Sequence, residues 1–552
     1  MRKKNSKLTL ITTVVTIIFG AAYFYIMLPA INLSDPSFYG FLIAVSAVYC
    51  LLTIVGRELH IADSASEFWE GVKKSCLIPL VVLLGCTAIY LVGTVISTPF
   101  LRAKAYSRLL TVTTADFIAD IEEISFTQIP MLDEDSAKKL GDAKMGELAD
   151  MVSQFDVATD YVQINYRGRP VRVTPLCYDD YIKWFYNTRE GLPAYLIIDM
   201  VSQNVDVVRI SEIAPGETGI RYSTNEHFSR HLSRHLRFNY PTYMFDPANF
   251  EINDDGIPYW VCPRIVKRIG LFGGEDIDGA VLVNAITGES EYFASDQIPA
   301  WVDRVYTSDL IMKQYDYYGK YQSGFINSFM GQKNVTVTTE GYNYIAIGDD
   351  IYTYSGITSV GEDSSNIGFI LTNQRFKTTK FYPIAGATEL SASASAQGAV
   401  QHLSYTATFP LLLNISSQPT YFMALKDKAG LVKKYAMVNV SQYQIVATGD
   451  TVSECNLNYI DMLARNGLSV GPVKGSETIT GVIEDIRAAV IDGNSRVYIK
   501  LRGNAFYYSI SVADNELAIA LNIGDRVSIN IPDSGAMGSG SLIHPALSVE
   551  LQ

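Results

Sequence analysis

Three histidines are spaced so that one helix could carry them on neighbouring turns. The segment 226–237 has apolar residues at helical spacing, and His227, His231 and His235 recur in it at intervals of four. A helix rises about 1.5 Å per residue, so the outer two would stand about 12 Å apart and only neighbours could share one ion. A metal bound by an adjacent pair would still need a ligand from elsewhere in the chain. These histidines are the candidate metal ligands of the sequence.

A second interpretation of the same segment needs no metal. Phe228, Leu232 and Leu236 have the spacing of a buried stripe, which would leave the histidines on the solvent side together with Arg230 and Arg234. Both interpretations remain open at this stage.

Other residues with chemical potential do not form a recognisable catalytic set. Asp276 and Asp278 begin like an EF-hand loop, but Ala280 and Val281 stand where a third oxygen ligand and the obligatory glycine belong. Cys177 has no histidine nearby in sequence to activate it. The sequence therefore names no catalytic residue and no cofactor. We expect a non-catalytic protein and keep an enzyme as the alternative.

Four segments predict β-hairpins built on one plan. In each segment an apolar, β-branched strand is followed by a short polar break and a second strand. The segments are 193–210, 278–293, 366–382 and 434–446. Their breaks are centred on Asp199, Asn284, Asn373 and Asn439, residue types that favour turns. An isolated hairpin is marginal in water. The repetition therefore predicts a series of related α+β modules in which the four hairpins occupy equivalent positions.

One of these hairpins resembles a known family. The sequence GAVLVNAITGESEYF, preceded by GIPYWV, lies within residues 256–293 and resembles a PepSY-type module. The resemblance implies a small non-catalytic α+β domain, often found in envelope proteins and sometimes associated with restraint of peptidases. The third and fourth hairpins depart from the motif at the Thr-Gly-Glu turn.

Composition limits the class of partner. The 552 residues carry a net charge of -13, which argues against nucleic acid because bound phosphates require clustered Lys and Arg. Six cysteines, three of them in or beside apolar runs, argue against a disulfide framework. The 35 tyrosines favour a β-rich region with half-buried strand faces.

Three apolar runs, at 8–28, 38–55 and 76–96, predict membrane-spanning helices. None of the runs contains Asp, Glu, Lys, Arg or His, which disfavours an ion path through them. Basic residues precede the first run and lie between the second and third. By the positive-inside rule the N-terminus is cytoplasmic and the large C-terminal region is extracytoplasmic. Arg102, Lys104 and Arg108 follow the third run and weaken this assignment.

The pattern divides the chain into five regions. They are a three-helix transmembrane region (1–100), a helical stalk and first α+β module (101–213), a second, PepSY-like module (214–330), a third region with two hairpins (331–475) and a C-terminal unit (476–552). Helices are predicted at 101–124, 133–152, 178–188 and 298–330. Five short strand candidates in the last unit are typical of a small OB-like β-barrel. The predicted fold class is a membrane-anchored α+β protein with β-rich repeated modules.

These expectations lead to a hypothesis about function. We expect a multi-pass cell-membrane protein whose extracytoplasmic modules bind or scaffold a partner in the cell envelope. Its partners would be the lipid bilayer and a protein or envelope polymer, with a homo-oligomer also possible. The alternatives are an envelope hydrolase or peptidase regulator, and an accessory subunit of a membrane complex.

Overall fold

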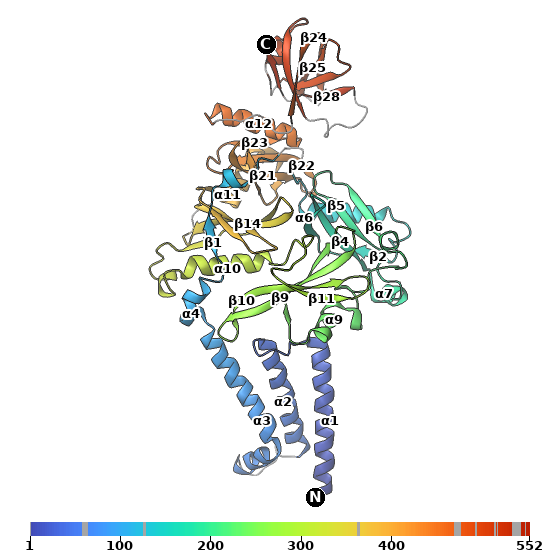
Figure 1. Ribbon diagram of the computed structural model, residues 1–552, viewed down its shortest axis with the longest axis vertical. Coiled ribbons are helices and arrows are strands. Elements are labelled where there is room, and N and C mark those ends of the chain that lie inside the picture. Colours follow the sequence, from blue (N-terminus) through green and yellow to red (C-terminus); the bar gives the residue numbers. More distant parts are fainter. Residues whose placement is uncertain are drawn as a thin grey trace.

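Three N-terminal helices are long and apolar enough to cross a membrane (Figure 1). They are α1 (Arg2–Met27), α2 (Pro36–Gly56) and α3 (Ala65–Ile96). The structure is a computed structural model that describes residues 2–57, 65–124, 129–361, 365–468, 476–491, 494–512, 515, 517–532, 542–546 and 548–552. Each of the three predicted spans is thus present as a helix.

The three helices are linked at the end that lies nearest the N-terminus. Arg57, at the end of α2, donates hydrogen bonds to the hydroxyls of Thr9 in α1 at 2.9 Å and Ser75 in α3 at 2.7 Å. Next to Ser75, the backbone of Cys76 leaves the helical conformation. Pro79 explains this kink, because its ring lacks an N–H and collides with the carbonyl four residues earlier.

Residues 101–124 do not form the predicted helical stalk. Helix α4 (Pro99–Tyr106) is followed by strand β1 (Val112–Thr114) and the short helix α5 (Phe117–Asp120). The β-branched run around β1 favours an extended backbone, and β1 pairs in parallel with strand β17, far along the chain. The prediction was wrong because Leu110 and Phe117, which have helical spacing, are buried against a distant sheet.

Above the helices lies a β-rich body, which we define as residues 99–468 (Figure 1). The first sheet contains β2 (Phe155–Val157), β3 (Val162–Tyr166), β4 (Arg169–Tyr178), β5 (Ala194–Asp199) and β6 (Val205–Arg209). The second contains β7 (Met244–Phe245), β8 (Asn249–Ile252), β9 (Pro258–Ile269), β10 (Gly273–Asn284) and β11 (Ser290–Ala294).

Two further sheets complete the body. The third contains β12 (Thr336–Thr338), β13 (Asn343–Ile347), β14 (Asp350–Ser359), β16 (Gly368–Asn373) and β17 (Thr379–Tyr382), with β1 added at its edge. The fourth contains β19 (Thr406–Ala407), β20 (Leu411–Ile415), β21 (Gln418–Lys426), β22 (Val432–Asn439) and β23 (Val446–Gly449). Strands β15 (Ser365–Asn366) and β18 (Gly386–Ala387) form a separate small pair.

One strand order recurs in all four sheets. Two short strands pair with the same long strand, the long strand pairs with a fourth, and the fourth forms a hairpin with the fifth, all antiparallel. We call each sheet, with the helix that precedes it, a module. The domain boundaries drawn from the sequence remain predictions.

The turns of the four hairpins share their hydrogen bonds. The Oδ1 atoms of Asp199, Asn284 and Asn373 each accept the backbone N–H groups of the residues two and three positions later. Asn439 accepts from the residue three positions later, in a turn that is one residue longer. Such capping by a short polar side chain is why Asp and Asn mark turns. The four predicted hairpins are confirmed, with these residues at equivalent places.

Helices connect and cover the sheets. They are α6 (Glu134–Gly146), α7 (Tyr181–Asn187), α8 (Ile210–Ile213), α9 (Leu232–Asn239), α10 (Ser308–Tyr321), α11 (Glu389–Ala399) and α12 (Val452–Arg465). The long helix predicted at 298–330 is confirmed only over α10. Pro299 and Gly324 stand outside its ends, and the buried segment 302–306 before it is not helical.

The modules share hydrophobic cores in pairs. Leu196 of the first sheet and Trp260 of the second belong to one core, which α6 also enters through Met145. Tyr354 of the third sheet and Tyr421 of the fourth belong to another. The modules therefore pack against one another within each pair. Contacts between modules can build sites.

The C-terminal region 476–552 forms a sheet of six strands in the order β28-β26-β25-β24-β27-β29. The strands are β24 (Ser476–Ile491), β25 (Asn494–Leu501), β26 (Tyr507–Ser511), β27 (Arg526–Pro532), β28 (Ile543–Pro545) and β29 (Ser548–Leu551), with helix α13 (Leu517–Ala520). Within the described residues no pairing joins β28 to β29, so an OB-like closed barrel is not confirmed.

Candidate binding site between the modules

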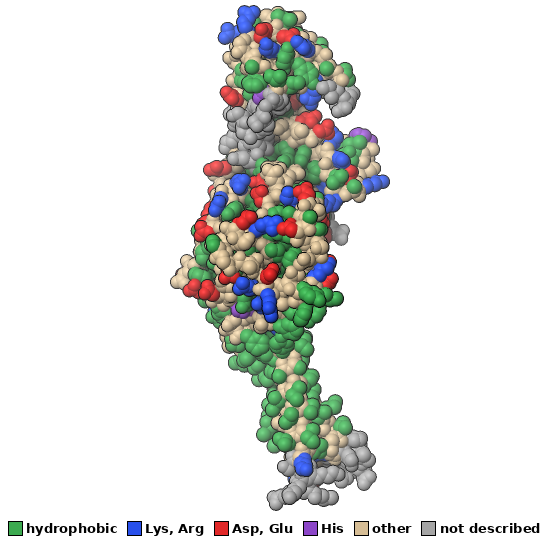
Figure 2. Space-filling view, turned by 90° about the vertical axis from the view of Figure 1, so that its right-hand side faces the viewer, with side chains coloured by type: hydrophobic (Ala, Val, Ile, Leu, Met, Phe, Trp, Pro, Cys, Tyr) green, Lys and Arg blue, Asp and Glu red, His purple; other side chains and the backbone are tan. Residues whose placement is uncertain are grey.

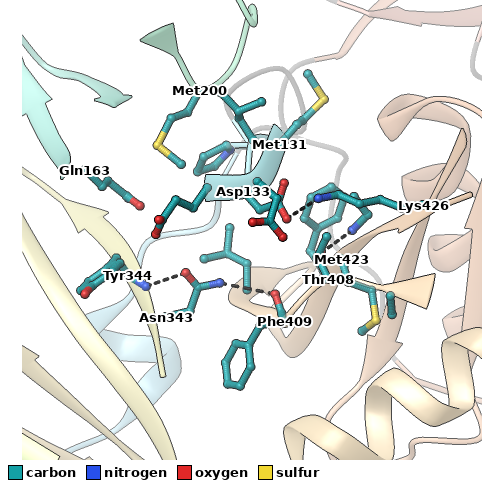
Figure 3. A pocket seen from close by; sticks show the side chains of 18 of the residues that line it. Met131, Asp133, Gln163, Met200, Asn343, Tyr344, Thr408, Phe409, Met423 and Lys426 are labelled. Carbon is teal, nitrogen blue, oxygen red and sulfur yellow. Dashed lines mark hydrogen bonds and ion pairs between the residues drawn. The ribbon is translucent and has the colours of Figure 1, made fainter. Parts of the chain in front are cut away.

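A cavity of about 610 Å³ lies between the first module and the third and fourth (Figure 3). Its walls come from the start of α6 and strands β3 and β4 on one side, and from β13, β19 and β21 on the other. This volume is that of a pocket for a small molecule or a short stretch of a polymer.

Two polar side chains on neighbouring strands line the first-module wall. Gln163 of β3 and Arg172 of β4 are cross-strand partners. Gln163 is only 1% exposed, and neither atom of its amide has a hydrogen-bond partner in the described part of the chain. Its side chain extends into the cavity (Figure 3). A buried polar group without a partner costs about 1–3 kcal/mol, so the placement calls for an explanation.

Arg172 has one hydrogen-bond partner and one unpaired donor. Its Nη1 donates to the carbonyl oxygen of Tyr161 at 3.0 Å, but its Nε has no acceptor and it makes no ion pair among the described residues. Burial lowers the pKa of Arg172, the nearby carboxylate of Glu134 opposes this, and the positive charge of Arg304 adds to it. A guanidinium so placed has unused capacity to donate to an anion.

The opposite edge of the cavity contains an ion pair between two modules. Lys426 of β21 donates to the carboxylate of Asp133, which also caps α6 by accepting from the N–H of Ser136 at 3.1 Å. Burial raises the pKa of Asp133, but the hydrogen bonds from Lys426 and Ser136 outweigh burial and leave that pKa below its ordinary value. The charge of Lys426 is thus satisfied within the protein, unlike that of Arg172.

The lining also has adaptable apolar side chains, beside the carboxylates of Glu134 and Asp135. Met131, Met200 and Met423 come from three separate segments and line the cavity together with Phe409 (Figure 3). Unbranched thioether side chains can repack around ligands of different shape. Asn343 is already engaged, since it donates to the carbonyl oxygen of Phe409 at 3.4 Å and accepts from the N–H of Tyr344 at 2.8 Å.

The chemistry that this lining supports is binding. It offers an amide donor and acceptor, a guanidinium donor and flexible apolar walls. It also contains the carboxylates of Glu134 and Asp135 and the hydroxyls of Thr406 and Thr408, and its residues include no histidine or cysteine.

A buried pair of carboxyl groups lies next to the cavity and joins the first three modules. Glu251 of β8 accepts the backbone N–H groups of Asp303 at 2.8 Å and Arg304 at 3.0 Å. The Asp303 carboxylate accepts the N–H of Asn165 in β3 at 2.6 Å. Arg304 donates to the Tyr344 hydroxyl in the third module at 2.6 Å.

Both carboxyl groups have perturbed acidity. Burial raises the pKa of Glu251, although the two backbone hydrogen bonds oppose it. Burial also raises the pKa of Asp303, and the negative charge of Glu251 adds to the effect. Both carboxyl groups therefore favour the protonated form more than they would in water.

The three histidines do not lie on one helix. Helix α9 begins only at Leu232, and His231 precedes it in an extended conformation. The prediction of a helix over 226–237 was therefore wrong for its first half. The three histidines do not have the i, i+4, i+8 arrangement on one helix. His231 Nδ1 has no hydrogen-bond partner in the described part of the chain, and burial lowers the pKa of His231.

The other two histidines face different neighbours. The ring of His227 packs on Trp184 at 4.7 Å, whereas Nε2 of His235 lies 2.8 Å from the carbonyl oxygen of Gly288. Across the described residues, no three or more His, Cys, Asp or Glu side chains gather as a metal site. The metal-binding candidates His227, His231 and His235 remain a prediction.

The remaining candidates from the sequence are two aspartates in ion pairs and one partly buried cysteine. Asp276 makes ion pairs with Lys377 and Arg268, and Asp278 lies 3.5 Å from Arg264. Cys177 is a free thiol whose pKa burial raises to about 11.

Sequence reasoning did not find the cavity residues. Gln163 and Arg172 lie in strands that alternate with apolar residues, a pattern typical of a solvent-facing side. Only the packing of the third and fourth modules over that side buries them, and no local signal in the sequence records that contact.

No protein-family model, curated protein or solved structure matches this chain. The resemblance to a PepSY-type module at 256–293 therefore remains a prediction.

Proposed function

We propose that this chain is a membrane-anchored binding protein of the cell envelope that captures a peptide segment of a partner protein in the cavity between its modules. The three helices would hold it in the cell membrane, with the body and the C-terminal sheet outside. The repeated strand order supports a further part of this proposal, that the body arose as related α+β modules.

The observation that carries the proposal is the pairing of Gln163 with Arg172. A primary amide with both its donor and its acceptor free can bond the backbone N–H and C=O of one residue in an extended peptide. The free Nε of Arg172 beside it can donate to a carboxylate, either an acidic side chain or a C-terminus. The three methionines would then cover apolar side chains of the same segment.

The same observation makes binding separable from folding. Replacing Gln163 by Leu removes two unpaired buried atoms at nearly constant volume, so the unliganded protein should be as stable as the wild type or more stable. The same substitution should weaken peptide binding by about 10- to 100-fold, which corresponds to about 1.4–2.8 kcal/mol.

Peptide selection on the full-length protein in lipid nanodiscs tests this proposal. Random phage-displayed peptides are the probe, and affinities of the selected peptides are measured for the wild type, Gln163→Leu and the control Arg169→Ala. Arg169 lies on the same strand as Arg172, but its side chain is 65% exposed. We expect selected peptides to carry a carboxylate and to bind the control as they bind the wild type.

Three results would contradict the proposal. They are selection of no peptide above empty nanodiscs, equal binding to Gln163→Leu, and a lower melting temperature for that variant without ligand. A pool of acidic oligosaccharides is the second probe. If it alone bound, with affinity lost in Gln163→Leu, the ligand would be an envelope polymer and not a peptide.

A further inference from the structure

Large apolar side chains are exposed at the base of the body, where it meets the three helices. Six of them, between 53% and 75% exposed, form what we call the basal rim: Phe100, Leu101, Phe238, Ile326, Phe329 and Met330. Large apolar side chains exposed together at one end of a body mark a binding or membrane site.

One part of the basal rim lies at the end of α3. Phe100 follows that helix by four residues, and its ring centroid is 5.4 Å from that of Phe325. The ring of Phe325 is in turn 5.5 Å from Phe329. The segment after α10 is therefore held beside the point where the chain leaves the predicted span.

The other part of the basal rim lies on the end of α1. The ring of Phe238 in α9 is 6.0 Å from Phe24 and 6.3 Å from Tyr25, in the last turn of α1. Nε of Arg237 donates to the carbonyl oxygen of Leu28 at 3.0 Å. Helix α9 thus sits directly on α1, as Figure 1 shows.

The first part of the rim has a rigid support. Tyr317, Tyr321 and Phe325 form a stacked series at 5.9 Å intervals along one side of α10 and the turn after it, and Tyr106 of α4 packs against Tyr317 at 4.7 Å. Aromatic contacts of this kind hold the apolar segment 326–330 in place and do not leave it free to fold inward.

The surface around the rim has the character of a membrane interface. Apolar side chains extend from the helices onto the lower part of the body, with other side chains and backbone between them (Figure 2). Arg102 and Lys104 are exposed beside Phe100 and Leu101. Aromatic side chains and basic residues together are typical of the headgroup layer, where rings sit at the interface and cations meet anionic lipids.

We propose that the basal rim is inserted in the interfacial layer of the same bilayer that α1 to α3 span. Its contacts with the ends of α1 and α3 fix it at that depth, so lipid covers it wherever the helices are inserted. A bilayer's polar layer adds about 5–7 Å on each side of the hydrocarbon core, enough to receive side chains at the helix ends. The body is therefore seated on the membrane with a fixed tilt, and the basic residues after the third span pair with headgroups.

Tryptophan quenching in lipid nanodiscs tests the proposal with the full-length chain. Phe329→Trp keeps an aromatic residue in the rim, and Tyr443→Trp, at a 53% exposed residue in the β22–β23 turn of the fourth module, is the matched control. Emission of each variant, after subtraction of the wild type with its four tryptophans, is compared in plain lipid and in lipid brominated near the headgroup, and then with aqueous acrylamide.

We expect brominated lipid to remove more than half of the added emission of Phe329→Trp and acrylamide to remove little of it. The control should show the reverse. If acrylamide quenched both variants alike, the rim would be in water and the proposal would be wrong. Protection of Phe329→Trp from both quenchers would place a second copy of the chain over the rim and would equally overturn it.

Discussion

Leu282 illustrates at the residue scale how the hairpin plan is tied to a core. It lies in β10 two residues before the turn residue Asn284, is 5% exposed, and belongs to the core that α10 enters with Leu310 and Ile311. A substitution at this buried residue should therefore have a much larger effect on stability than a substitution at an exposed residue of the same hairpin.

We predict that Leu282→Asp unfolds the second module. The substitution would bury a carboxylate with no cation beside it in that core, at a cost of several kcal/mol, which is a large part of the stability of a typical domain. Glu289→Lys is the control, because Glu289 is exposed in the same hairpin and its replacement should change stability by no more than about 0.5 kcal/mol. Chemical denaturation measures both, and a Leu282→Asp protein as stable as the control would show that this core does not hold the module.

At the scale of elements, the joint between modules depends on protonation. Strand β8, the segment before α10 and the end of β3 meet at Glu251, Asp303 and Asn165, and burial raises the pKa of both carboxyl groups. Because a carboxyl with a raised pKa binds its proton more tightly in the folded protein, the joint is most stable when both groups are protonated.

This joint should make the protein less stable as the pH rises. Stability from these groups is complete below the ordinary carboxyl pKa of about 4 and is lost as pH rises through the raised folded pKa values. Each unit of pKa difference corresponds to about 1.4 kcal/mol. Melting temperatures measured between pH 5 and pH 8 should therefore fall in the wild type.

The fall of melting temperature with pH should be shallower in Asp303→Asn. The Asn side chain can still accept the N–H of Asn165, but it carries no charge. Asp255→Asn, in an exposed turn, is the matched control and should keep the wild-type slope. An Asp303→Asn protein with the wild-type slope would assign the pH dependence to other groups.

At the scale of the whole molecule, the prediction concerns the side of the membrane on which the body lies. The basic residues predict that the body lies outside the cell. Lys428, exposed in the turn between β21 and β22 of the fourth module, is a site for trypsin. Trypsin added to cells stripped of their wall should cut there, while Lys73 and Lys74, near the start of α3, should stay uncut until the membrane is opened. The reverse pattern would invert the topology.

Local features of the fold were determined by the sequence alone. Three uncharged apolar runs require helices in a bilayer, because a spanning backbone must satisfy its own hydrogen bonds. The hairpins at Asp199, Asn284, Asn373 and Asn439 follow from turn chemistry that involves neighbouring residues only. Five strand candidates in the C-terminal unit likewise appear as strands.

Contacts between distant segments were decided only by the tertiary structure. Part of the segment 101–124, predicted as a helical stalk, forms β1. It does so because it pairs with the edge strand β17 at Thr379 and the residues after it. The histidine segment left the helix at His231, although its spacing was helical. Gln163 and Arg172 became buried donors because the third and fourth modules cover a strand face that looks solvated in sequence. Periodicity reports which side of an element is apolar, but the partner that covers the polar side is set by packing over the whole chain.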